Sequence, residues 1–126
     1  MLDLLLPQRC LICAAPGELV CRSCLERLPR LRPPLCDRCG APTAWPVERC
    51  RECAGRRLAF ASARAAVAYD PAVRELVAGW KERGLRGIAV RAAEVTVEAL
   101  ERPDVDVLVP VPRDDDRSLR RGHHPA

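Results

Sequence analysis

Large hydrophobic side chains are scarce in the first half of this chain, and aromatic residues make up only 3% of the whole. A segment so poor in bulky residues cannot bury enough surface to form a core by itself, and a metal commonly takes over that role. No apolar run approaches the roughly 18 residues that span a membrane. The short apolar stretch at residues 1–6 is interrupted by Asp3 and precedes no cleavage-site pattern, so we expect no secretory signal.

Lysine is also nearly absent, because Lys81 is the only one among 21 basic residues. With 17 acidic residues the net charge is +4, and the acidic run at residues 114–116 adjoins the basic end of the chain. This small excess of positive charge is less than the concentrated basic patch that is typical of a nucleic-acid-binding surface. The 126 residues allow one ordinary domain or two small ones, and we expect a cytoplasmic protein.

Cysteine is plentiful and strictly patterned. All eight cysteines form four CxxC pairs, and a CxxC turn aims two sulfurs at one point, so two turns complete a tetrahedral thiolate site for zinc. Buried free cysteines seldom pair in this way, disulfides need an oxidising compartment, and no thioredoxin-like frame surrounds a pair. The pattern therefore predicts two zinc ions, with the ligands Cys10, Cys13, Cys21, Cys24, Cys36, Cys39, Cys50 and Cys53.

The spacing favours pairing of neighbouring turns. Seven residues separate Cys13 from Cys21 and ten separate Cys39 from Cys50, whereas eleven lie between the second and third turns. Short loops cost the least entropy to close, so we assign the first four cysteines to one ion and the last four to the other. A crossed arrangement is the open alternative. Four sulfurs leave no position for water, so both sites are predicted to be structural, not catalytic.

Two local features fit this arrangement. The proline- and arginine-rich run at residues 30–34 cannot continue a helix and is predicted to join two zinc lobes. Gly40, directly after Cys39, suits a tight turn in which backbone amides point at a thiolate.

The chain changes character after Cys53. Residues 63–69 are small and apolar and predict a strand. Asp70 and Pro71 predict a helix start, and the helix is expected to end before Gly84. A second helix is expected from about residue 87 to 100. The predicted buried stripes of the two helices are Val73, Leu76, Val77 and Trp80, and Ile88, Ala92, Val95 and Ala99.

Residues 105–112 form a nearly continuous apolar run, which is typical of a strand covered on both faces of a parallel sheet. Such a strand needs neighbours, and the polar residues 113–126 supply none. We therefore expect an incomplete second domain, whose exposed strand edge would favour self-association.

The motifs, in their order along the chain, resemble the ComF family of competence-related, phosphoribosyltransferase-like proteins associated with DNA uptake in bacteria. The resemblance rests on the CxxC array, on Tyr69-Asp70-Pro71, on Trp80-Lys81 before Gly84, on Val109-Pro110-Val111-Pro112, and on Arg120-Arg121-Gly122. It implies an α+β fold with a double zinc ribbon at residues 1–58 and an incomplete α/β type I phosphoribosyltransferase-like domain at residues 59–126. Single-stranded DNA or proteins of the competence machinery are the implied partners.

The resemblance also implies limits. The family's phosphate-cradling loop lies beyond this point, so we expect a truncated, non-catalytic form with no catalytic residue. Lys81, Arg120 and Arg121 are the candidates for phosphate contact, because charge-assisted hydrogen bonds favour such groups. The alternative hypothesis is a stand-alone zinc-ribbon adaptor that binds protein or nucleic acid. The sequence leaves the substrate, the partner and the oligomeric state open.

Overall fold

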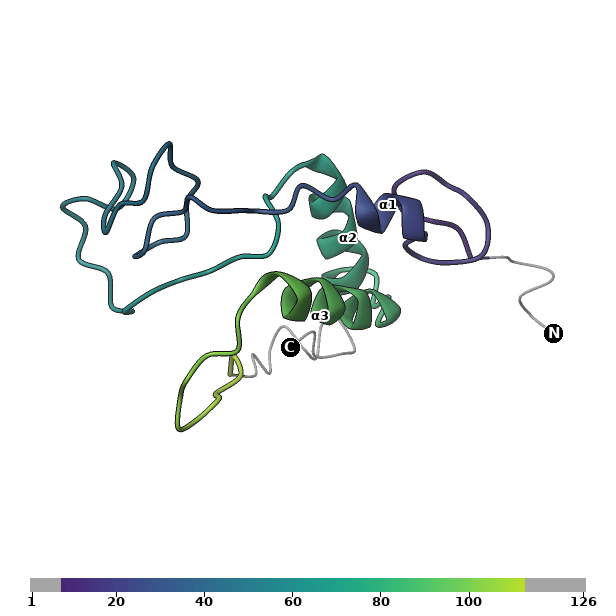
Figure 1. The fold of residues 1–126 in the computed structure, drawn as a ribbon. Coiled ribbons are helices and arrows are strands. Elements are labelled where there is room, and N and C mark those ends of the chain that lie inside the picture. Colours follow the sequence, from purple (N-terminus) through teal and green to yellow (C-terminus); the bar gives the residue numbers. More distant parts are fainter. Residues whose placement is uncertain (1–7, 113–126) are drawn as a thin grey trace.

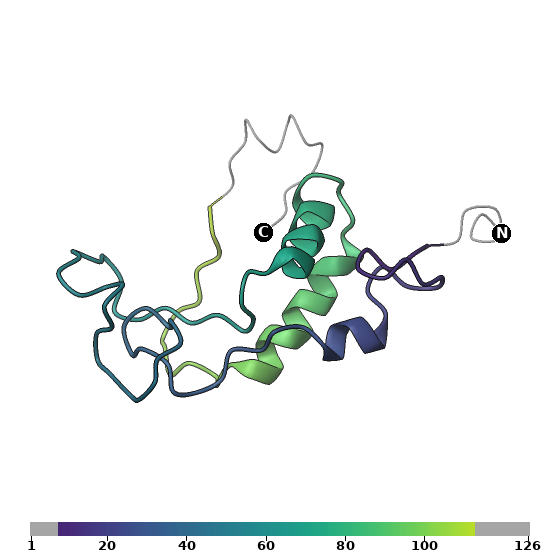
Figure 2. The same ribbon diagram turned by 90° about the horizontal axis from the view of Figure 1, so that it is seen from above.

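A helical pair lies between two cysteine-rich lobes in this computed structural model, which describes residues 8–112. Lobe 1 comprises residues 8–28 and contains the short helix α1, Arg22–Glu26. Helices α2, Pro71–Lys81, and α3, Gly87–Ala99, form the pair. Lobe 2, residues 35–64, contains no helix and projects away from the pair, as both ribbon views show (Figures 1 and 2).

Helix α2 begins where the sequence predicts. Asp70 is its N-cap, with a side-chain oxygen that accepts a hydrogen bond of 2.8 Å from the Val73 amide. Pro71 occupies the first helical position, where its missing N–H costs nothing. The predicted stripe is confirmed: Val73 and Leu76 are buried, and Val77 and Trp80 pack against the core at its edge.

Helix α3 follows α2 after a short turn that contains Gly84, and the two helices cross at a steep angle (Figures 1 and 2). Ile88 and Val95 face the core and are only 3% and 4% exposed, as predicted. Ala92 is half-buried, whereas Ala99 is exposed. The prediction for Ala99 was wrong because the helix ends there, beyond the reach of its partners.

Lobe 1 supplies part of the same core. Val20 is 2% exposed and Leu28 8% exposed, and both belong to the buried cluster that includes the stripes of α2 and α3. Leu11 packs against Gly79 of α2, so closely that a Cβ added to Gly79 would lie 2.6 Å from the Cδ1 atom of Leu11. Burial of these side chains stabilises the packing of lobe 1 against the helices.

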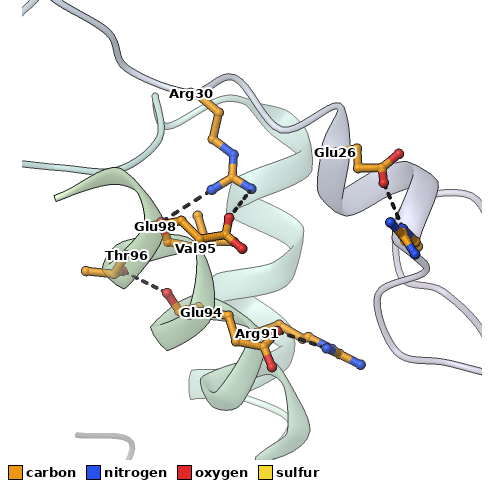
Figure 3. A network of polar contacts seen from close by, with 9 residues as sticks. Glu26, Arg30, Arg91, Glu94, Val95, Thr96 and Glu98 are labelled. Carbon is orange, nitrogen blue, oxygen red and sulfur yellow. Dashed lines mark hydrogen bonds and ion pairs between the residues drawn. The ribbon is translucent and has the colours of Figure 1, made fainter.

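Polar contacts join the same parts at the surface. Arg30, which follows α1, donates to the Val95 carbonyl at 3.3 Å and approaches the Glu98 carboxylate at 3.5 Å (Figure 3). Arg91 on α3 contacts Glu18 of lobe 1 at 3.4 Å. Exposed ion pairs contribute little each, so these contacts orient lobe 1 more than they stabilise it.

The β structure is limited to isolated bridges. Residues 63–69 pair only through the antiparallel bridge of Val67 with Arg30, and residues 105–112 form no strand. Both strand predictions were wrong for the same reason, since a strand persists only when neighbouring strands complete its hydrogen bonds. The phosphoribosyltransferase-like architecture and the boundary after residue 58 stay predictions, and the core joins residues from both sides of that boundary.

Within residues 8–112, no helix has the length and apolar character needed to cross a membrane. The predicted phosphate contacts Arg120 and Arg121 lie outside the described residues.

Replacing the helix cap tests why α2 starts at Pro71. Asp70→Ala should lower the free energy of unfolding by about 1 kcal/mol, because the Val73 amide loses its acceptor. Asp70→Ser, which keeps a capping oxygen, should retain most of that stability. Urea unfolding of the zinc-loaded protein, followed by far-UV circular dichroism, measures both. Equal losses in the two variants would contradict the capping role.

Candidate metal centres

The structure gathers the eight cysteines into two groups of four. Within each group the sulfur atoms all lie within 4.8 Å of one another, and no disulfide joins any of them. The groups follow the sequential pairing of CxxC turns, not the crossed one. Site 1 consists of Cys10, Cys13, Cys21 and Cys24, and site 2 consists of Cys36, Cys39, Cys50 and Cys53.

The spacing of the sulfur atoms suits zinc. A zinc ion with Zn–S bonds of about 2.3 Å and tetrahedral angles holds its sulfurs about 3.8 Å apart. In site 1 the sulfurs of Cys13 and Cys21 are 3.6 Å apart. In site 2 the Cys36 and Cys53 sulfurs are 3.7 Å apart. Both sets of ligands therefore fit a zinc ion, which would hold each lobe together by cross-linking two turns.

The first turn of each site is the same small hairpin. The Cys10 amide donates to the Ala15 carbonyl at 2.8 Å, and the Cys36 amide donates to the Ala41 carbonyl at the same distance. The residue after the second cysteine has a positive φ in both cases, 60° at Ala14 and 71° at Gly40. Both hairpins have the sequence Cys-x-x-Cys-x-Ala-Pro, at residues 10–16 and 36–42, and this repeat could have predicted their shared geometry.

The second turn of each site is built differently. In site 1 it opens into helix α1, which begins directly after Cys21 and buries Cys24. In site 2 it is a non-helical turn that ends at Gly55, with φ of 74°. In both sites the amide of the third cysteine points at the first sulfur, at 3.5 Å for Cys21 and 3.2 Å for Cys50. Such N–H donors stabilise thiolates and fix their orientation.

The last residues of lobe 2, residues 63 and 64, pass over the first turn of site 2. The Ala63 amide donates to the Arg38 carbonyl at 2.9 Å, and the Arg64 guanidinium donates to the Asp37 carbonyl at 2.8 Å. Gly40 permits this close approach, because a Cβ there would lie 2.6 Å from the Ala63 oxygen. The same backbone hairpin in lobe 1 packs instead on α2, through Leu11.

In each site one thiol has a pKa lowered to about 6. The Ser23 hydroxyl lies 3.3 Å from the Cys21 sulfur and lowers the pKa of Cys21 to about 6. Burial acts to raise the pKa of Cys36, but backbone N–H groups, those of Cys39 and Cys50 first, outweigh it and lower the pKa to about 6. These two sulfurs are already thiolates at neutral pH and are the first to attract a cation.

In each site one other thiol has a pKa raised to about 12. The Arg27 guanidinium favours the Cys24 thiolate, yet burial and the neighbouring cysteines prevail and raise the pKa of Cys24 to about 12. Burial, followed by the neighbouring thiols, raises the pKa of Cys53 to about 12 as well. Zinc must displace protons from these thiols, so acid competes with the metal for both sites.

The remaining predicted contact residue is Lys81. It is exposed at the end of α2, with its ammonium group 6.0 Å from the centre of the Trp80 ring. Its role in phosphate contact stays a prediction.

Comparison with known proteins agrees with this geometry for the first part of the chain. Residues 1–54 match the family described as the double zinc ribbon domain, and the match includes all eight cysteines. Searches of curated proteins and of solved structures found no match. The chain thus has an N-terminal zinc-binding double ribbon with two four-cysteine groups that fit two zinc ions.

Two glycine substitutions separate backbone strain from steric conflict in lobe 2. Gly55 has open space where a Cβ would stand, so Gly55→Ala should cost only the left-handed conformation, about 1 kcal/mol. Gly40→Ala adds a steric conflict with the Ala63 carbonyl to the same backbone strain. It should therefore lower the free energy of unfolding by about 1–3 kcal/mol more than Gly55→Ala does. Urea unfolding with zinc present measures the difference. Similar losses would show that Ala63 does not pack against Gly40.

Proposed function

We propose that this chain is a ComF-like, zinc-folded protein that acts in DNA uptake, and that lobe 2 is its contact surface for single-stranded DNA. The observation that supports this proposal most directly is that lobe 2 combines arginines without an ion-pair partner and exposed aromatic rings. The order of motifs described above supports the family assignment. The closed four-sulfur sites support a structural role for zinc, with binding as the function and no catalysis.

Arginine dominates the charge of lobe 2. Residues 35–64 carry six arginines against three acidic residues. Among residues 8–112 none of these arginines forms an ion pair, whereas four arginines outside lobe 2 do: Arg22, Arg30, Arg83 and Arg91. Arg38, Arg49 and Arg64 donate to backbone carbonyls, whereas Arg51, Arg56 and Arg57 are exposed and make no side-chain hydrogen bond within residues 8–112. Exposed guanidiniums of this kind can bind phosphate oxygens, which carry most of the affinity for nucleic acid. The six are Arg38, Arg49, Arg51, Arg56, Arg57 and Arg64.

Lobe 2 also exposes two of the four aromatic residues of the chain. Trp45 is 68% exposed and Phe60 is 42% exposed. The Arg38 guanidinium lies 5.9 Å from the centre of the Phe60 ring. Single strands bind to such surfaces because each base can stack on an aromatic face while cations follow the backbone. A duplex keeps its bases stacked inside and gains less, which favours single-stranded DNA as the ligand.

Fluorescence anisotropy with a labelled oligo(dT) tests this contact surface. Trp45→Ala should weaken binding about tenfold or more, since one base–aromatic stack contributes roughly 1–3 kcal/mol. Tyr69→Ala is a matched control, because Tyr69 is also 68% exposed but lies outside lobe 2. The double substitution Arg56→Gln and Arg57→Gln should reduce the dependence of the affinity on salt. Equal effects of the two aromatic substitutions would contradict the assignment to lobe 2.

A second candidate function, a protein-binding adaptor, rests on a different observation. Residues 105–111 expose five large apolar side chains, by 54–80% of their area: Val105, Val107, Leu108, Val109 and Val111. Exposed apolar clusters of this kind commonly mark protein contacts. The adaptor hypothesis predicts no affinity for oligo(dT) at low salt, and a protein partner that Val107→Asp releases while Trp45→Ala does not.

A further inference from the structure

The two metal sites share a backbone design but differ in what covers their first turn. In site 2 the returning chain at Ala63 and Arg64 hydrogen-bonds to the turn, and Cys39 is partly buried. In site 1 the equivalent residue is Cys13, and it is exposed. Cys13 of site 1 is therefore more exposed to solvent than Cys39, its counterpart in site 2, which is half-buried.

The exposed sulfur has a neighbour within easy reach. The sulfur of Cys21, which is half-buried, lies 3.6 Å from that of Cys13, whereas Cys10 and Cys24 are only 3% and 2% exposed. Site 1 thus has an outer pair and an inner pair of sulfurs. No cysteine of site 2 is exposed, and Cys36 is fully covered.

We propose that Cys13 and Cys21 form an oxidation site for hydrogen peroxide, whose modification releases the zinc of site 1 and leaves site 2 intact. The Cys13 sulfur attacks one peroxide oxygen, the O–O bond breaks, and hydroxide leaves. The Cys21 sulfur then attacks the Cys13 sulfur, an S–S bond forms, and a second hydroxide leaves. The two sulfurs lose two electrons in total, and the peroxide gains them. Cys10 and Cys24 remain as two thiolates, too few to hold the ion.

Oxidation would loosen more than the metal site. Lobe 1 contributes Val20 and Leu28 to the core of the helical pair, and Leu11 packs beside Gly79 of α2. Trp80, near the end of α2, packs against this same core. Loss of zinc from site 1 therefore exposes Trp80 to water, whereas loss from site 2 leaves the core of the helices in place.

The first experiment treats the zinc-loaded full chain with hydrogen peroxide and follows released zinc with a chromogenic chelator. One zinc per chain should appear at least about tenfold faster than the second, because thiolate oxidation follows exposure. Trypsin cleaves after Arg9 and Arg22, so one peptide holds Cys10, Cys13 and Cys21. Its mass should fall by two hydrogens, and fragmentation should place the disulfide between Cys13 and Cys21. Simultaneous release of both ions, or a first disulfide within residues 36–53 or between Cys10 and Cys13, would overturn the proposal.

A tryptophan readout assigns the fast phase without removing a ligand. In Trp45→Phe the remaining tryptophan is Trp80, and its emission should shift to the red together with the first zinc, then recover with dithiothreitol and added zinc. In Trp80→Phe the remaining Trp45 should report no change during that phase. A fast zinc phase that leaves Trp80 emission unchanged would place the oxidised site in lobe 2 and contradict the proposal.

Discussion

Coordination of a metal ion by four thiolates is the interaction on which the first half of this molecule depends. Lobe 2 contributes no residue to the hydrophobic core around α2 and α3, and its turns are joined by isolated bridges, not by strands. The apolar area that it buries cannot offset the entropy of ordering some thirty residues. Two CxxC turns that converge on one ion close short loops and supply the missing free energy through metal–sulfur bonds. Acid, chelators and oxidants should therefore act on this fold before heat does.

The same hairpin serves two different purposes in its two copies. In lobe 1 it presents Leu11 and Val20 to the helices, so the first metal site also stabilises the helical core. In lobe 2 the equivalent surface is covered by the chain's own return at Ala63, and the rest of the lobe faces solvent with its arginines and Trp45. Lobe 1 thus supports the helices, and lobe 2 is the part that we propose contacts single-stranded DNA. Figure 1 shows this separation, with lobe 2 extended away from α2 and α3.

The sequence was most informative where spacing is dictated by chemistry. The CxxC pairs predicted two four-sulfur groups because only such turns converge on a point, and the 3.6-residue period placed Val73, Leu76, Ile88 and Val95 in the core. Helix α1 escaped prediction because five residues carry no periodicity of their own and are ordered by the turn that starts at Cys21. The strands failed because their existence depends on partners elsewhere in the chain. The packing of lobe 1 against α2 could not be predicted from the sequence either, because it results from tertiary contacts between residues far apart in the chain.

Native mass spectrometry of the intact protein tests the central claim most directly, namely that two zinc ions hold the two lobes separately. The account predicts two zinc ions in the purified chain, and one ion each in Cys24→Ser and Cys53→Ser. Far-UV circular dichroism of the two variants should show that helical signal falls in Cys24→Ser and persists in Cys53→Ser, because only site 1 adjoins the helical core. A native chain that folds with one zinc ion or none, or a Cys53→Ser variant that loses its helices, would contradict it.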